Sequence, residues 1–363
     1  MKRILLVTAA LSAFLFGLVS VSHTELVTTY RNVKAIGMGD TRIAGGMDYN
    51  GFIDNPALLS RVNTLRFSIL NFPLYVNKDL SDMAKFVNDN RDRFKNFDNL
   101  TDAEKDQFIK DVEPYDGKWA RVNLSPMLDL AASFAGQSLG LAVYSVNDVN
   151  FKIDRGIYEP RVWGQGVSDI AVVLGYSRPL DILTPGLKVG ANLRYLQHRT
   201  ANLFQIKATD LGNINETVKP ILDEAKNSTS SHVAVDIGAL WTVPLIESDV
   251  GAVIKNFGFG PQYTVDLGIA KKLYNDRIIL LADYVDFFDK NRENVFRKIH
   301  IGGEYDLRIV NLRVGLNSGY PTVGAGINLK FFQVDAAYFT DELSNAPGVQ
   351  DDPRYAVQLR LGW

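Results

Sequence analysis

Oxygen-bearing side chains near residue 285 are spaced closely enough to suggest a cation site. Asp283, Asp286, Asp289 and Asn291 carry the carboxylate and amide oxygens that calcium prefers. They lack the glycine and the spacing of an EF-hand loop, so an ordinary solvated loop is the better interpretation. The chain has no cysteine, and its histidines show no ligand spacing. These histidines are His23, His198, His232 and His300. We therefore expect no metal site.

The glycines of Gly37-Met38-Gly39 could open a dinucleotide-binding turn, but the motif is incomplete. Arg42 stands where that motif needs glycine or alanine, and no strand is predicted before it. The chain has no Walker loop and no G-x-S-x-G motif, and we find no catalytic pair. A formal net charge of −2 gives no basic excess for nucleic acid. We predict a protein that is not an enzyme, uses no cofactor and binds no nucleic acid.

Strands must position these side chains, because the dominant period from residue 127 onward is two. In the last segment Tyr355, Leu359 and Trp363 share an apolar face, whereas Gln358 and Arg360 lie on the other. We predict an all-β fold, a transmembrane antiparallel β-barrel of about fourteen strands, an even number as bacterial barrels require. The candidate strands are 65–76, 127–135, 138–146, 168–178, 186–198, 232–244, 248–257, 261–273, 277–287, 296–305, 309–317, 320–330, 332–340 and 353–363.

The predicted connections sort by length between the two ends of the barrel. One end has only short connections, as the periplasmic turns of outer-membrane barrels do: 136–137, 179–185, 245–247, 274–276, 306–308 and 331. Every long connection falls at the other, external end, whose connections are 77–126, 147–167, 199–231, 258–260, 288–295, 318–319 and 341–352. A soluble β-sandwich has no reason to sort its loops in this way.

Two of the long external loops have helical patterns, at 79–112 and 210–227. In the first, Ser81 is a candidate helix cap, and Thr101-Asp-Ala-Glu104 has the pattern of a capping box. Each loop carries an apolar stripe at helical spacing. The stripes either dock the loops onto the barrel rim or form a landing groove for a ligand, and simple docking is the more ordinary interpretation.

Residues 1–22 have the pattern of a cleaved signal peptide. Lys2 and Arg3 precede an apolar run, and Ser20-Val21-Ser22 supplies small residues before the expected cleavage site. A transmembrane anchor is the alternative, since the run is nearly long enough to span a bilayer. Export would deliver residues 65–363 to the cell outer membrane as an integral barrel, with membrane lipid and the barrel-assembly machinery as partners. Tyr355, Leu359 and Trp363 would form the assembly signal.

The predicted inner face of the barrel carries charges of both signs. Opposite charges facing across a narrow lumen would pair and could hold a plug, unlike the one-sign lining of an ion-selective pore. These residues are Asp129, Asp169, Lys188, Arg194, Asp236, Asp266, Lys272, Asp283, Lys298, His300, Glu304, Arg313, Lys330, Asp335 and Arg360. Apolar residues predicted on the same face are candidate ligand contacts, namely Leu70, Phe72, Tyr144, Leu240, Ile279, Leu281 and Phe339.

Residues 23–64 do not alternate and are rich in glycine. They contain Ala35-Ile-Gly37-Met-Gly39 and, some fifteen residues later, Asn55-Pro56-Ala57. This pattern resembles the N-terminal hatch of the FadL family of outer-membrane transporters of hydrophobic compounds, which includes PorV-like proteins of secretion systems. The resemblance implies that residues 23–64 form a hatch, with Gly37, Gly39, Asn55, Pro56 and Ala57 in its gating motif.

Two functions follow as expectations. The first is an outer-membrane channel for uptake of small hydrophobic molecules, resembling long-chain fatty acids, gated by the hatch. The alternative is a PorV-like scaffold that does not transport and that anchors surface or secretion proteins. The polar lumen favours the scaffold a little, and the helical external loops fit either function.

Overall fold

Alternation of inward and outward side chains produces a single antiparallel sheet that closes on itself. The computed structural model describes residues 30–45, 49–156, 159–207, 219–220, 228–259, 263–291, 294–344 and 347–363. The strands are β1 (Arg66–Asn77), β2 (Trp119–Leu124), β3 (Met127–Phe134), β4 (Gln137–Asp154), β5 (Arg161–Pro179), β6 (Leu187–Lys207), β7 (Thr229–Val243), β8 (Ser248–Phe259), β9 (Thr264–Leu273), β10 (Ile278–Tyr284), β11 (Ile299–Asp306), β12 (Val310–Asn317), β13 (Tyr320–Asn328), β14 (Phe332–Glu342) and β15 (Asp351–Gly362).

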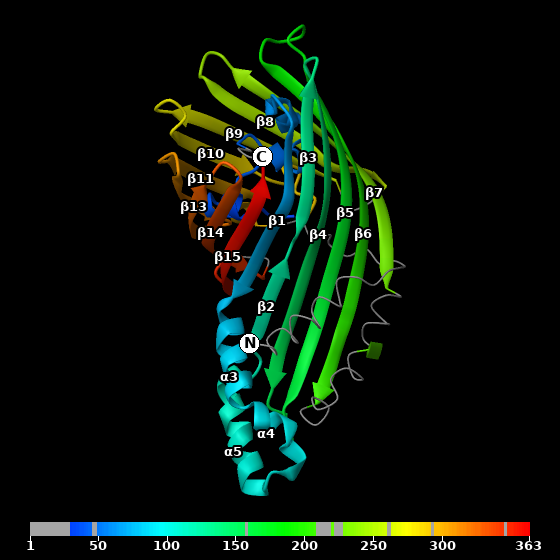
Figure 1. Cartoon of the computed structure of the whole chain (residues 1–363), viewed down its shortest axis with the longest axis vertical. Helices are drawn as coiled ribbons and strands as arrows, with labels where there is room; N and C mark the ends of the chain where they lie inside the picture. Colours follow the sequence, from blue (N-terminus) through cyan, green and yellow to red (C-terminus); the bar gives the residue numbers. More distant parts are fainter. Residues whose placement is uncertain are drawn as a thin grey trace.

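The barrel closes where β1 pairs with β15, and each of the other strands pairs with its neighbours in the chain (Figure 1). β2 and β3 both lie between β1 and β4 and are parts of one strand, interrupted at Ser125 and Pro126. Proline has no backbone N–H, so it cannot donate to a strand ladder at this point. Counting β2 and β3 together gives fourteen strands, which confirms the predicted barrel.

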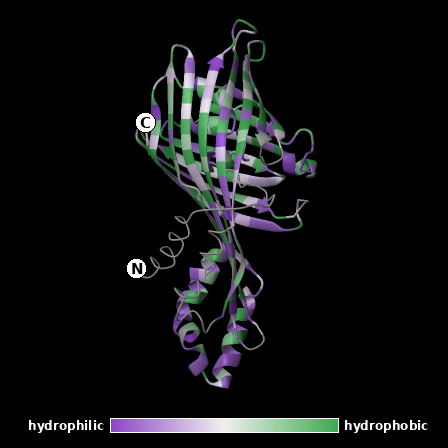
Figure 2. Ribbon diagram, turned by 90° about the vertical axis from the view of Figure 1, so that its right-hand side faces the viewer, coloured by the Kyte–Doolittle hydropathy of each residue, from purple (hydrophilic) through white to green (hydrophobic). Residues whose placement is uncertain are grey.

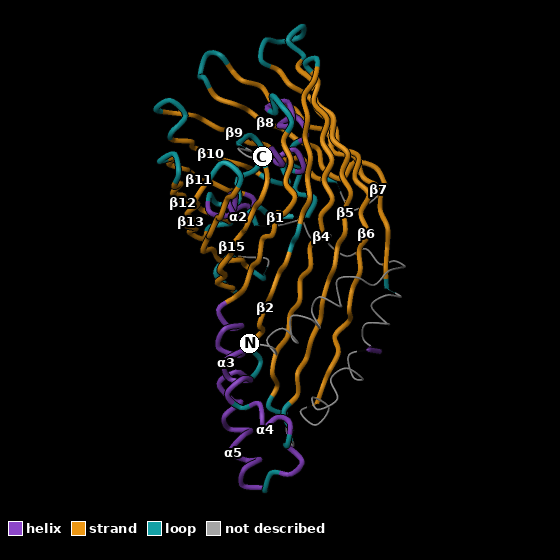
Figure 3. The backbone as a smooth tube through the Cα atoms, in the orientation of Figure 1, coloured by secondary structure: helices purple, strands orange, loops and turns teal. Residues whose placement is uncertain are grey.

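Three strands extend well past their predicted ends. β4, β5 and β6 span 137–154, 161–179 and 187–207, so much of the expected loops 147–167 and 199–231 is strand. These extensions, with β2, form a tall wall on one side of the barrel (Figure 3). The predicted ends of these strands were too early, because the prediction relied on an apolar outward face. Beyond the apolar belt, as in Asn147-Asp148-Val149-Asn150, backbone pairing continues without that alternation.

The outer face of the barrel is apolar. Large hydrophobic side chains that are exposed to the surroundings include Leu193, Ile237, Leu280, Val314 and Val357. Their alternation with polar residues is visible along the strands in Figure 2. Tyr355 and Trp363 are each 49% exposed, in keeping with the predicted outward face of the last strand. This belt is what a barrel surrounded by lipid requires.

A helical arm extends from the end of β1, at the opposite end of the barrel from the short turns (Figure 2). It contains α3 (Lys78–Asp89), α4 (Arg91–Lys95), η3 (Phe97–Asn99), α5 (Asp102–Val112) and η4 (Glu113–Tyr115). Met83, Phe86 and Phe108 form its own hydrophobic core with residues of β2 and β4. We call this end the helical end and the opposite one the turn end.

The arm confirms the helical pattern in 79–112 and corrects one of its caps. Thr101 and Glu104 form the predicted capping box at the start of α5. The first helix instead begins three residues before Ser81, because the side chain of Asn77 accepts a hydrogen bond from the Leu80 N–H and caps α3. In the second loop, 210–227, only residues 219–220 are described, so the predicted helix there lies outside the described residues.

A further short helix, η6 (Val295–Lys298), precedes β11. None of the helices in the described ranges is long and apolar enough to cross a membrane. The predicted signal peptide, 1–22, lies outside the described residues.

Candidate functional site

The described part of the hatch, residues 30–45 and 49–62, lies inside the barrel. It contains α2 (Val33–Gly37), η1 (Tyr49–Ile53) and η2 (Pro56–Arg61). The side chain of Asn32 caps α2 by accepting from the Lys34 N–H at 2.8 Å. Asn55 caps η2 in the same way, accepting from the Ala57 N–H at 3.1 Å, and Pro56 occupies the first helical position, which suits its fixed φ.

Apolar side chains anchor the hatch to opposite sides of the barrel wall. Phe52 and Leu59 pack with inward residues of β3–β6. Met38 and Leu58 pack with inward residues of β7, β9 and β10. Val33 and Ile36 contact β1, β14 and β15. The hatch therefore fills the cross-section of the lumen between opposite walls.

Glycines of the wall allow the hatch backbone to approach closely. A Cβ added at Gly302 would lie 2.0 Å from the carbonyl oxygen of Met38, and one at Gly315 would lie 2.2 Å from the nitrogen of Gly39. Gly39 itself has φ +71°, a conformation that glycine adopts without strain. A larger residue at any of the three positions would push the hatch away from β11 and β12.

Asn55 holds the centre of the hatch by hydrogen bonds in several directions. It is fully buried. Its amide nitrogen donates to the carbonyl oxygen of Ile43 at 2.9 Å and to that of Ala239, in the wall, at 3.3 Å. With its cap to Ala57, the side chain joins two segments of the hatch to β7. Asn55-Pro56-Ala57 is thus a structural junction.

One network of charges lies within the hatch and reaches β14. Arg31 pairs with Asp341 at 3.0 Å and with Asp40 at 3.3 Å. Arg42 pairs with Asp40 at 3.5 Å and with Asp54 at 3.1 Å. Two cations thus alternate with three carboxylates through the interior.

Burial and these pairings act on the two hatch carboxyls with opposite results. Burial alone would raise the pKa of Asp40, but the guanidinium groups of Arg42 and Arg31 outweigh it and lower that pKa. For Asp54, burial is the stronger effect and raises the pKa, although Arg42 opposes the shift. Of these two carboxyls, Asp40 is therefore the one that holds its charge more firmly.

A second network ties α2 to β11, β12 and β14. Arg313 is 1% exposed and contacts Glu304 at 2.6 Å and Asp335 at 2.6 Å. Lys34 of the hatch reaches Glu304 at 3.5 Å. The mixed charges predicted on the inner face do pair here, as expected for a narrow lumen. Each buried charge has a partner of opposite sign, which offsets its loss of water.

The acidic residues near 285 are engaged by protein groups. Asp283 accepts from the backbone N–H groups of Arg42 at 2.5 Å and Ile43 at 2.9 Å, so it binds the hatch. Asp286 accepts from the backbone N–H groups of the following loop, and Asp289 contacts Lys298. Within the described ranges, no group of three or more His, Asp or Glu is arranged to hold a metal ion.

The predicted apolar contacts divide into two groups. Tyr144, Leu240, Ile279, Leu281 and Phe339 are buried, and each belongs to a cluster that contains hatch residues. They therefore contact the hatch in this structure.

The inward placement predicted for Phe72 is wrong, because this side chain is exposed on the outer face, and Leu70 is only half-buried. The register of β1 shifts between Ser68 and Asn71. Such a bulge adds a residue, and every side chain after it changes face.

Sequence analysis missed the residues that lock the hatch electrostatically. Arg31, Asp40, Arg42 and Asp54 lie in a segment that was singled out for its glycines and for Asn55-Pro56-Ala57, and none of the four was assigned a role in holding it. Alternating Arg and Asp in an otherwise small and apolar segment was an available signal, since charges placed in a plug need partners. Tyr75 was also missed, and its hydroxyl donates to the carbonyl oxygen of Arg31.

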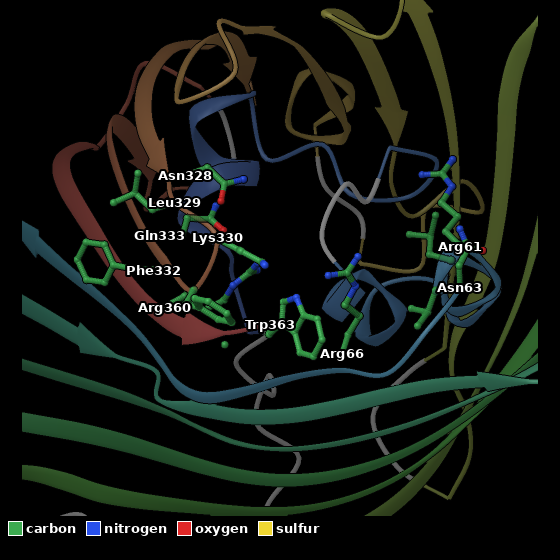
Figure 4. Close-up of a pocket in the computed structure, with 14 residues that line it drawn as sticks. Arg61, Asn63, Arg66, Asn328, Leu329, Lys330, Phe332, Gln333, Arg360 and Trp363 are labelled. Atoms are coloured by element: carbon green, nitrogen blue, oxygen red, sulfur yellow. The ribbon is translucent and has the colours of Figure 1, made fainter.

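A cavity of about 350 Å³ opens at the turn end, between η2 and the ends of β1 and β15. Its lining includes Arg61, Arg66, Lys330, Arg360 and Trp363. Figure 4 shows the side chains of Lys330 and Arg360 extending toward one another, with Trp363 and Arg66 next to them. Leu58 and Val62 of the hatch, which belong to the apolar clusters between the hatch and the wall, also line this cavity.

A closed fourteen-stranded barrel with an internal N-terminal plug is the architecture of a class of outer-membrane channels. Solved structures that resemble this chain include three hydrocarbon channels. They are the toluene transporter TbuX of Ralstonia pickettii (12% identity, TM-score 0.53, covering 92% of this chain and 97% of that one), the toluene transporter TodX of Pseudomonas putida (11%, 0.52, 94% and 98%), and the CymD monoaromatic hydrocarbon channel (12%, 0.51, 90% and 96%).

These similarities establish the fold. The resemblance to the FadL family is confirmed at that level. No family model matches the chain, and no curated protein matches its sequence.

Proposed function

We propose that this protein is an outer-membrane channel for the uptake of small hydrophobic molecules and that its hatch is the gate. The observation that carries the proposal is the hatch itself, which occupies the lumen from wall to wall. A purely structural barrel interior could be filled by wall side chains alone, as in small barrels. The apolar belt and the fold shared with hydrocarbon channels support the proposal.

In this proposal the turn end faces the periplasm and the helical end faces the outside. Outer-membrane barrels have short turns on the periplasmic side and long loops on the external side. Residues 1–22 would direct export and be removed, and Tyr355, Leu359 and Trp363 would serve barrel assembly. An epitope tag inserted in the 79–112 arm should be detected on intact cells. Detection only after permeabilisation would reverse the orientation.

The gating step would be a shift of the hatch around Asn55-Pro56-Ala57. Much of the attachment is polar, through Asn55, Asp283 and the Arg42 network, and water or substrate can replace such contacts during a small displacement. Gly37 and Gly39 allow the adjoining segment to lie against the wall, and they would also allow it to move along β12 and β13.

The substrate would reach the hatch from the helical end. There, Val146 and Leu196 of the wall are buried in one cluster with Tyr30 and Tyr144. Tyr30 and Tyr144 are buried and lie 5.4 Å apart between ring centroids in a tilted arrangement, and a planar or chain-like apolar molecule would contact these rings once the hatch shifts. TbuX and TodX are toluene transporters, so toluene is a suitable first probe, and a long-chain fatty acid is the second.

The test is uptake of labelled toluene and of a labelled fatty acid by intact cells. We would compare cells without the protein, with the wild type, and with Asn55→Ala combined with Pro56→Ala. The matched control is Asn88→Ala with Pro114→Ala, which changes the same residue types at exposed positions of the arm. The variant with Asn55→Ala and Pro56→Ala should change uptake of at least one probe while its barrel still assembles. The control variant should take up both probes as the wild type does.

Uptake of both probes that is equal in all four strains would exclude transport. The scaffold function would then be favoured, and one observation supports it. The arm of residues 78–115 has a hydrophobic core of its own and projects beyond the barrel, so it could present a stable surface to a partner protein. Photocrosslinking from exposed positions of the arm, such as Lys85 and Asp106, would capture such a partner at the cell surface.

A further inference from the structure

A chain of charged side chains runs along the inner face of the barrel, from the base of the helical arm to the hatch. Arg121 of β2 pairs with Asp352 of β15 at 3.3 Å, and Asp352 pairs with Arg354 at 2.7 Å. Arg354 reaches Asp341 of β14 at 3.4 Å, and Asp341 in turn holds Arg31 of the hatch at 3.0 Å. These side chains are 5–24% exposed, so solvent screens their interactions only weakly.

Asn77 connects this chain of charges to the arm. Its buried side-chain oxygen accepts from the N–H of Leu80, in the first turn of α3, at 3.2 Å and from the N–H of Arg121 at 2.9 Å. Its side-chain nitrogen donates to Asp352 at 3.0 Å and to the carbonyl oxygen of Trp119 at 2.7 Å. The arm, β2 and β15 therefore meet at one carboxamide, and Asp352 is where that junction joins the charges.

Two carboxylates of the chain share one cation. Asp341 and Asp352 lie directly opposite each other in the pairing of β14 with β15, and the guanidinium of Arg354 contacts both. Like charges in opposite positions destabilise a strand pair, so the two carboxylates compete for Arg354. One nitrogen of Arg31 lies 3.0 Å from each oxygen of Asp341. A change at Asp352 therefore alters how strongly Asp341 attracts the hatch.

The docking of the hatch near β15 depends on the position of Arg31. Two residues further on, the N–H of Val33 donates to the side chain of Gln358 in β15 at 2.8 Å. Arg31 also contacts Asp40 at 3.3 Å, and Asp40 has φ +65°, a conformation that L-residues other than asparagine and aspartate rarely adopt. Loss of Arg31 from its place would remove one of the groups that hold Asp40 in this conformation.

We propose that Asp352 is a positioning residue that couples the helical arm to the hatch. Without its carboxylate, Arg354 would turn to Asp341 and weaken the attraction of Asp341 for Arg31. Without the cation of Arg121, Asp352 would take more of Arg354 and leave Asp341 to Arg31. The sign of the effect thus follows the sign of the charge removed.

Movement of the arm would act on the same balance. A shift of the first turn of α3 changes the distance between Asn77 and Asp352, and so holds or releases the hatch. As regulation of a gate, this inference rests on the proposed transport function. The coupling itself can be measured without transport.

Hydrogen exchange of the purified full-length barrel, measured without substrate, tests the coupling. The Val33 N–H reports docking of the hatch to β15. The test variants are Asp352→Asn and Arg121→Gln, and Asp352→Glu keeps the charge as a rescue. The control is Asp111→Asn, which removes a carboxylate from an ion pair with Arg93 inside the arm.

Exchange of the Val33 N–H should be about fivefold or more faster in Asp352→Asn, near the wild-type rate in Asp352→Glu and Asp111→Asn, and slower in Arg121→Gln. General loosening of the arm base would instead speed exchange in both test variants. Unchanged exchange in Asp352→Asn, an equal rise in the control, or exchange in Arg121→Gln that is not slower than in the wild type would overturn the proposal. If Asp352→Asn does not assemble, Arg121→Gln decides by the same criterion.

The two proposals fail in different ways. A barrel that shows these exchange differences but takes up neither probe has a coupled plug and no transport. A barrel that takes up a probe but lacks the exchange differences has a gate that the arm does not control.

Discussion

Replacing Gly238 by alanine should loosen the hatch without damaging the barrel. Gly238 lies on the inner face of β7 and faces the Asn55 junction. A Cβ added there would lie 2.0 Å from the Asn55 side-chain oxygen and 2.8 Å from Cδ of Pro56. The Asn55 side chain cannot rotate away without breaking its bonds to Ile43 and Ala57, and the proline ring has no rotamer that clears the methyl group.

The size of the effect follows from the contacts. Overpacking by one methyl group costs about 1–3 kcal/mol when the neighbours cannot yield. If that energy falls on hatch docking, the population of the displaced hatch rises by about 5- to 150-fold. The barrel should be spared, because Gly238 pairs with Gly190 of β6 and Val253 of β8 through the backbone ladder, which an added methyl group leaves in place.

Hydrogen exchange of the hatch amides measures this population. The Leu58 N–H, bonded to the Asn55 carbonyl at 3.0 Å, should exchange faster in Gly238→Ala by a factor within that range. Gly303→Ala is the matched control: it lies on the outer face of β11, where an added Cβ meets nothing closer than 3.3 Å. Unchanged exchange in a correctly assembled Gly238→Ala barrel, or an equal rise in the control, would refute the reasoning.

Three further predictions concern charge and assembly. Arg313→Ala should destabilise the protein by about 3–5 kcal/mol, because it leaves two buried carboxylates without their main partner. The loss would be measured as a lower temperature at which the barrel unfolds in heat-modifiable gel migration. Arg155→Ala, the control, removes a half-exposed ion pair and should cost at most about 1 kcal/mol. Deleting Trp363 should impair membrane insertion, and normal heat-modifiable migration after the deletion would contradict the assembly signal. Asp40→Asn should weaken hatch docking at neutral pH. Because the folded-state pKa of Asp40 is lowered, the stabilisation by its carboxylate is present above the unfolded-state pKa and is lost as the pH falls through the folded-state pKa. The difference in hydrogen exchange of the hatch amides between this variant and the wild type should therefore vanish in strong acid.

The barrel could be predicted because its physics is local and repetitive. In each strand, inward and outward side chains alternate with a period of two residues. In 233–241, for example, outward Val233 and Ile237 alternate with inward Asp236 and Leu240. The order of short and long connections then fixes the two ends. The mixed charges of the lumen were also readable, and Glu304, Arg313 and Asp335 pair as that mixture requires.

Features that depend on non-local contacts could not be predicted. The bulge after Ser68 places Phe72 on the outer face, and nothing in the local alternation marks the extra residue. The extensions of β4–β6 are stabilised by backbone pairing beyond the apolar belt. The side chain of Asn55 donates to the carbonyl oxygen of Ala239 in β7, about 180 residues away, and lies against the inward Gly238. Only the closed barrel brings these segments together.

The central claim, that the lumen is a path for small hydrophobic molecules, is tested most directly by crystals of the purified barrel soaked with bromobenzene. Bromine can be located by its anomalous scattering. The account predicts a bromine site inside the barrel on the helical side of the hatch, next to Tyr30, Tyr144 and Leu196. Bromine found only against the outer apolar wall, with the interior clusters unchanged, would contradict it.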